Sequence, residues 1–190
     1  MLDAAPSLVG ASVDITDPQE TGEGLGREWS RMRRLWVHVD LAVRRPGLAL
    51  LRPRIDAAAA TLTDLTVTTH FDLVLSSGQP RLLLPQLLRL RCIAELADAI
   101  DAPRLRCLIA TRAITEPVAA LAQRCRELEA LRFADVPTWA RNGKDPDLAA
   151  AAAFCAALGR GGLRHVRELA VGDFAAPTAL LPALGGCCFL

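Results

Sequence analysis

A short apolar pattern recurs along this chain and constrains its fold more than any other feature. An apolar residue is followed by two variable residues, a second apolar residue, one variable residue and a third apolar residue. The clearest copy places these apolar residues at Leu62, Leu65 and Val67. The other copies start at Leu8, Met32, Leu87, Leu105, Leu128 and Val166. Because self-similarity at a period of about 20–50 residues is typical of stacked repeats, the pattern predicts a repeat architecture.

Helical segments are expected between the copies. Apolar residues at i, i+3, i+4 and i+7 indicate one buried face of a helix. This spacing precedes four copies, at Leu48–Ala58, Ile93–Ile100, Val118–Cys125 and Leu148–Leu158. The copies start 24, 30, 25, 18, 23 and 38 residues apart, so the room for a helix varies from repeat to repeat. The chain is therefore predicted to alternate short strands with helices of different lengths.

The pattern resembles the leucine-rich-repeat family over roughly Leu8 to Gly185, and most of all the irregular repeats that follow F-box motifs. The resemblance implies a solenoid with a parallel sheet on its concave face and helices or loops on its convex side. The family's pattern continues to an Asn or Cys three residues beyond the last apolar position. The residues at those positions here are Asp40, His70, Glu95, Ala113, Val136 and Phe174. The usual side-chain ladder between repeats is therefore expected to be missing or replaced.

We expect one α/β domain over residues 1–190, with a flexible tail over 185–190. The sequence shows no L-P-x-E-L-like run near its start, so an F-box lies outside this chain or the resemblance covers the repeats alone. The chain is accordingly a whole protein or a fragment of one. The alternative fold is an ordinary α/β domain with a parallel sheet, because strand–helix alternation predicts that fold equally well.

Composition narrows the class of protein. Apolar residues make up 52% of the chain and charged residues 23%, which is typical of an ordered protein. A net charge of +1 argues against a nucleic-acid surface, which usually has a basic excess. The start lacks a secretory signal, and no apolar run reaches the length of a membrane span. We therefore expect a cytoplasmic or nuclear protein with reduced cysteines.

Motifs for catalysis are weak or missing. The run Gly22, Gly24, Gly26 would need a third glycine where Arg27 stands to be a dinucleotide fingerprint. The sequence has no phosphate-binding P-loop and no G-x-S-x-G turn. Three cysteines occupy apolar repeat positions and are expected to be buried, whereas Cys107 is expected to be exposed; the three are Cys92, Cys125 and Cys155. We expect no catalytic residue, no metal and no cofactor.

The last four residues, from Cys187 to Leu190, resemble a C-a-a-X prenylation box. The two preceding glycines would give the Cys187 thiol the mobility that a transferase needs. Against this reading, no polybasic stretch precedes the box, and a single lipid anchors weakly. The alternative is a cysteine near the end of the chain by chance. We expect membrane contact only if Cys187 is prenylated.

Strand side chains alternate, so the residues between the apolar positions should share the opposite face of the sheet. From that face we select seven partner-binding candidates: Arg34, Trp36, Asp64, Arg89, Arg91, Arg132 and Glu168. Trp and Arg are enriched among interface hot spots. The hypothesis is a non-catalytic protein-recognition module, such as the substrate-binding part of an F-box-type receptor, that grips an acidic or extended segment. The alternatives are a solvated sheet face, or a small α/β enzyme of unknown chemistry, with or without a lipid anchor.

Overall fold

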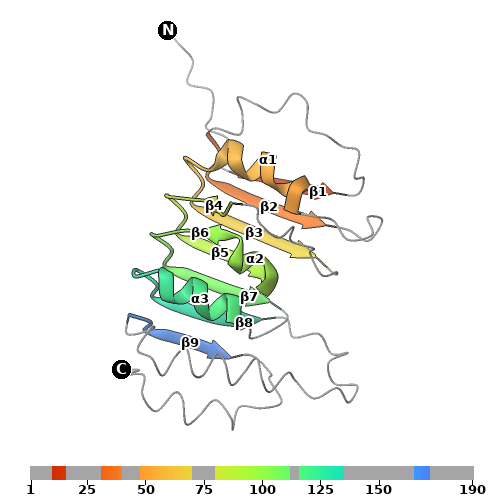
Figure 1. Cartoon of the computed structure of the whole chain (residues 1–190). Coiled ribbons are helices and arrows are strands. Elements are labelled where there is room, and N and C mark those ends of the chain that lie inside the picture. The colour runs from red at the N-terminus through yellow and green to blue at the C-terminus, as the bar shows by residue number, and fades with distance from the viewer. Residues whose placement is uncertain are drawn as a thin grey trace, which may run out of the picture.

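The computed structural model describes residues 10–15, 31–39, 48–69, 80–111, 116–134 and 165–171. In this part of the chain the main element is a parallel sheet whose seven strands follow one another in chain order, as Figure 1 shows from top to bottom. The strands are β1 (Gly10–Ile15), β2 (Arg34–Val39), β3 (Asp64–Thr69), β5 (Arg89–Ile93), β7 (Cys107–Thr111), β8 (Ala130–Ala134) and β9 (Glu168–Val171). The predicted α/β class with a parallel sheet is confirmed.

Helices α1 (Leu48–Ala58), α2 (Ala94–Asp98) and α3 (Glu116–Arg124) cover one face of this sheet (Figure 1). On the same side, β4 (Leu82–Leu83) and β6 (Ile100–Asp101) pair in parallel. The sequence placed Ile93 and Ile100 on a helical stripe, and this is wrong for both, because Ile93 ends β5, the helix covers Ala94–Asp98 only, and Ile100 begins β6. The helix expected over Leu148–Leu158 lies outside the described residues.

The strand register aligns equivalent positions of the repeats. The second apolar residues of successive copies are direct neighbours across the sheet, in the order Leu35, Leu65, Leu90, Leu108, Leu131 and Leu169. The first five are buried, and Leu169 packs partly buried against them. Even the weakest copy fits, because Ala11 of β1 lies opposite Leu35. The predicted repeat register is therefore confirmed along the described strands.

The backbone enters successive strands in the same way. The carbonyl of Arg33 accepts hydrogen bonds from the amides of Thr63 and Asp64, at 2.8 and 3.0 Å. The same two-donor arrangement recurs at the carbonyls of Thr63, Leu88, Arg106 and Glu129. These acceptors keep the uneven spacing of the apolar pattern and stand 18 to 30 residues apart. The differences in repeat length are therefore taken up between the strands, and strand entry is constant.

A single apolar core joins the sheet to the helices. The inward residues of α1, α2 and α3 belong to the same buried cluster as the strand leucines, and they include Ile55, Leu96, Val118 and Leu121. Full burial of one such side chain is worth roughly 1.5–3 kcal/mol. The apolar residues at helical spacing therefore form the buried faces of these helices, as predicted. The positions of the family's Asn/Cys ladder lie outside the side chains that the structure describes, as does the tail over 185–190.

Candidate functional site

One face of the main sheet carries no helix among the described residues, and we call it the open face. All seven partner-binding candidates lie on the open face, since each stands next to an inward leucine or between two inward residues. Trp36 is 53% exposed, which is unusual for a tryptophan. Arg34, Arg89, Arg132 and Glu168 are exposed, whereas Asp64 and Arg91 are partly buried. The register brings the candidates together; whether they bind a partner stays a prediction.

The open-face side chains form two parallel rows across the strands. The first row runs Arg34, Asp64, Arg89, Cys107, Ala130 and Glu168. The second row runs Trp36, Thr66, Arg91, Ile109, Arg132 and Ala170. Ser12 is the backbone neighbour of Trp36 on β1, but its side chain lies outside the description. Adjacent members of a row are about 4.8 Å apart, so each row is a regular set of attachment points.

Arg132 and Glu168 form a two-pronged ion pair between β8 and β9. The Arg132 Nε donates to Glu168 Oε1 at 2.7 Å, and Nη2 donates to Oε2 at 3.0 Å. The hydrogen bonds from Arg132 lower the pKa of the Glu168 carboxyl, and the same bonds raise the pKa of Arg132. Both groups are solvent-exposed, so the pair contributes little to stability. Its main consequence is that these two charges neutralise each other.

A second ion pair joins β3 to β5. The Nε of Arg89 lies 3.5 Å from Oδ1 of Asp64, and the two residues are register partners. The hydroxyl of Thr63 donates to Oδ2 of the same carboxylate at 2.8 Å. Asp64 is the more buried member of the pair, with 22% of its side chain exposed against 69% for Arg89. The Arg89 guanidinium therefore faces solvent, whereas the Asp64 carboxylate is held at the start of β3.

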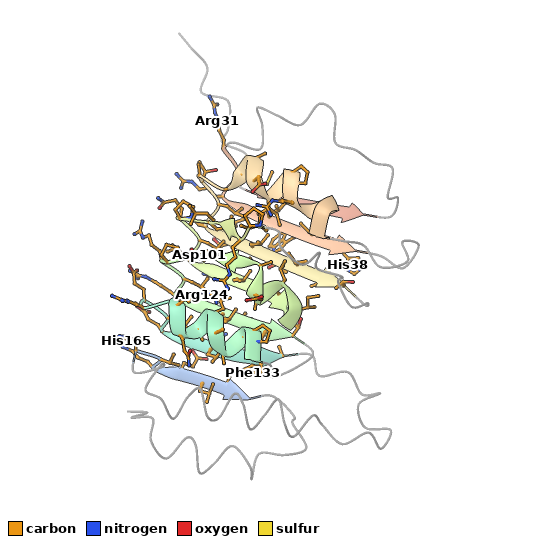
Figure 2. All side chains as sticks on the ribbon, in the orientation of Figure 1. Arg31, His38, Asp101, Arg124, Phe133 and His165 are labelled. Carbon is orange, nitrogen blue, oxygen red and sulfur yellow. The ribbon has the colours of Figure 1, made fainter. Side chains whose placement is uncertain are left out.

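Trp36 lies between two polar side chains on its own strand. Arg34 and His38 are two residues before and after it, so all three project from the same side of β2. The Nδ1 of His38 lies 2.9 Å from the hydroxyl oxygen of its register partner Thr68. Figure 2 shows His38 toward the end of β2 opposite to Arg31.

The cysteines in the described part behave as apolar residues. Cys92 and Cys125 are buried as predicted, and Cys125 donates to the carbonyl of Ala102 at 3.2 Å. Cys107 was expected to be exposed, and this is wrong, because it is half-buried among neighbours on the open face. Burial raises the pKa of Cys107 above its ordinary value of 9.0, and that of Cys125 to about 11. At neutral pH both are therefore thiols, which are poor nucleophiles.

Sequence reasoning missed the contacts of Arg124 on the helix-bearing side. Arg124 of α3 donates through Nη2 to the carbonyls of Ala97 and Ile100, at 3.4 and 3.2 Å. Burial lowers the pKa of Arg124, and the Asp98 and Asp101 carboxylates oppose this effect. Figure 2 labels Arg124 and Asp101 on this side of the molecule. The only signal in the sequence was that Arg124 stands in the last turn of α3, where a basic side chain interacts favourably with the C-terminal end of the helix. This position does not reveal which carbonyls Arg124 contacts.

Comparison with protein-family models, with curated proteins and with solved structures finds no match for this chain. No helix in the described residues is both long and apolar enough to cross a membrane. Within the same residues, no three His, Cys, Asp or Glu side chains are grouped so as to hold a metal ion. Cys187 and the glycines from Gly22 to Gly26 lie outside the description, so prenylation stays a prediction.

The Arg132–Glu168 pair predicts a pH dependence that can be measured at one carboxyl. Because Arg132 stabilises the ionised form, Glu168 should titrate below its ordinary pKa of 4.5 in an NMR titration. The stabilisation is present above that ordinary pKa and is lost as pH falls through the lowered one. Arg132→Met should return the midpoint toward 4.5, whereas the control Arg106→Met should not. A midpoint at or above 4.5 in the wild type would show that the pair does not form in solution.

Proposed function

We propose that this chain is a leucine-rich-repeat-like solenoid that binds another protein on its open face and has no catalytic role. The substrate-binding part of an F-box-type receptor in the cytoplasm or nucleus is the form of this function that we favour. The observation that supports it most is the pairing of an aligned sheet with an exposed Trp36 beside arginines. Solenoids of stacked repeats use such long surfaces for extended binding.

The solenoid itself is supported by the repetition of the backbone. Each strand pairs only with the strands that precede and follow it in the main sheet, in parallel. An ordinary doubly wound α/β sheet would change direction and place helices on both faces. In the described residues the strand order never reverses, and the helices lie on one face. This arrangement favours the repeat reading over the alternative fold.

The open face has the properties of a preorganised binding surface. Its side chains project from strands whose opposite face is packed into the core, so the backbone cannot move freely. Tryptophan and arginine carry large apolar or planar groups and dominate binding energy at many interfaces. A partner that covers Trp36 therefore gains apolar burial without the cost of ordering the sheet.

The proposal is tested by affinity purification from eukaryotic cells with open-face variants. We expect Trp36→Ala, Arg91→Glu and Arg132→Glu each to weaken the capture of the wild-type partners, as quantified by mass spectrometry. Arg104→Glu is the matched control, because Arg104 is an exposed arginine in a turn outside the open face. All variants are first shown to keep the wild-type melting temperature. Retention of every partner by all three open-face variants would refute the proposed function.

A further inference from the structure

We infer that the partner docks over β2, β3 and β5, through an extended acidic segment with an apolar side chain on Trp36. This inference rests on the proposed function and adds the position and the chemistry of the contact. It follows from the charges on the open face, from the exposure of Trp36 and from the spacing of the rows.

The charges on the open face are unevenly divided between its two ends. Over β2, β3 and β5, the described side chains carry three guanidinium groups and one carboxylate: Arg34, Arg89, Arg91 and Asp64. Over β7, β8 and β9 they carry one of each, Arg132 and Glu168, already joined by two hydrogen bonds. Whatever pairs form within the first group, its positive excess remains. An acidic ligand is therefore attracted to the β2–β5 end.

The edge of the sheet where the strands begin carries basic residues at both ends. Arg31 and Arg33 are exposed immediately before β2, and Figure 2 shows Arg31 at the β2 end of the molecule. At the other end Arg106 lies 3.8 Å from Glu127 and 3.9 Å from Glu129, and Arg104, Arg126 and Arg167 are exposed as well. The difference in charge between the two ends therefore belongs to the open face itself, where Trp36 lies.

Trp36 gives the same end its apolar contact. With 53% of its surface exposed, it is one of two large exposed apolar side chains in the described residues, and the other, Leu83, belongs to β4. An apolar side chain seated on the indole would bury surface that Arg34 and His38 flank on the same strand. The site therefore combines an apolar contact with surrounding donors, which suits an apolar residue within an acidic segment.

The row spacing sets the spacing of the ligand's side chains. Trp36, Thr66 and Arg91 are register neighbours, so Trp36 and Arg91 are two strand spacings or roughly 10 Å apart. A chain in polyproline II conformation rises about 3.1 Å per residue and returns to the same side every three residues. A segment crossing the strands would place an acidic residue on Arg91 when it stands three positions from the apolar residue on Trp36.

The test uses a defined probe, a fluorescein-labelled peptide of about ten residues, rich in proline and glutamate. It carries one leucine with a glutamate three positions to either side, and binding is followed by fluorescence anisotropy at constant salt. We expect Trp36→Ala, Arg34→Glu and Arg91→Glu each to weaken binding about tenfold, because they remove the apolar contact or reverse a charge at the site. Arg106→Gln is the matched control, because Arg106 is exposed just before β7 and is not a binding candidate, and it should change affinity less than about twofold. Replacing the leucine by serine, or the glutamates by glutamine, should also weaken binding.

Each other outcome overturns the inference in a recognisable way. No binding of the probe, or equal loss with Arg106→Gln, would reject docking at the β2–β5 end. Single-stranded DNA of similar length that binds as tightly as the peptide, with no effect of Trp36→Ala, would indicate a general polyanion surface instead. The proposed function fails separately, when the open-face variants retain every cellular partner in affinity purification. Partners lost only with Arg132→Glu in that experiment would keep the function and reject this location.

Discussion

Replacing Leu131 by alanine should lower the free energy of unfolding by about 2–5 kcal/mol. Leu131 is fully buried at the centre of β8, and its row neighbours Leu108 and Leu169 come from the strands on either side. Truncation removes apolar contacts and leaves a cavity that two flanking strands hold open. Urea denaturation followed by circular dichroism measures the change.

The matched control is Leu83→Ala, which makes the same chemical change at a side chain that is 59% exposed. We expect this variant to stay within about 0.5 kcal/mol of the wild type, as surface substitutions usually do. Equal losses in the two variants, or an unchanged denaturation midpoint for Leu131→Ala, would mean that the strand register is different from the one described.

Replacing Phe133 by alanine should cost about 3–5 kcal/mol. Phe133 is 3% exposed and holds the third apolar position of its repeat, where its register neighbour on β7 is only Ala110. A large side chain beside a small one fills space that the neighbour cannot reach. The loss should therefore exceed that of an isoleucine-to-valine change, about 0.5–1.5 kcal/mol, by a wide margin.

The same pair offers a rescue experiment. Ala110→Leu alone should destabilise the protein by about 1–3 kcal/mol, because the core is already filled. In the Phe133→Ala background the added leucine side chain enters the vacated space, so part of the lost stability should return. Additive losses in the double variant would show that Ala110 and Phe133 do not share one packing site.

The strands and their register could be predicted from the sequence because the apolar pattern is local and repeats. The central leucines mark the inward face of each strand, and the residue on either side must then project to the open face. The alternation of side chains along each strand was enough to predict that Trp36 and Arg91 share one surface, although they are 55 residues apart in the chain. The helices followed in the same way from apolar residues at helical spacing.

The elements between strands were harder to predict, because short segments carry few residues in any pattern. Eighteen residues separate the copies at Leu87 and Leu105, and they hold the five-residue α2 and the two-residue β6. An apolar stripe of four residues cannot distinguish a helix from a helix followed by a strand. Ile93 and Ile100 were therefore misplaced, although their burial in the common core was expected.

The ion pairs of the open face could not be predicted from the sequence either. Arg132 and Glu168 are 36 residues apart and meet diagonally, since their direct register partners are Ala170 and Ala130. Side-chain length and rotamer decide such a contact, and neither is encoded in the repeat. This ion pair changes the predicted charge of the open face, because the charges of two predicted binding residues cancel at the β8–β9 end of the sheet.

The most direct measurement is a hydroxyl-radical footprint of the protein alone and in complex with a partner recovered by affinity purification. If the open face is the interface, Trp36 should be protected strongly in the complex, while Leu83 on the helix-bearing side should be oxidised at the same rate as in the free protein. Protection confined to Leu83 and the helices, with Trp36 oxidised as fast as before, would contradict partner binding on the open face.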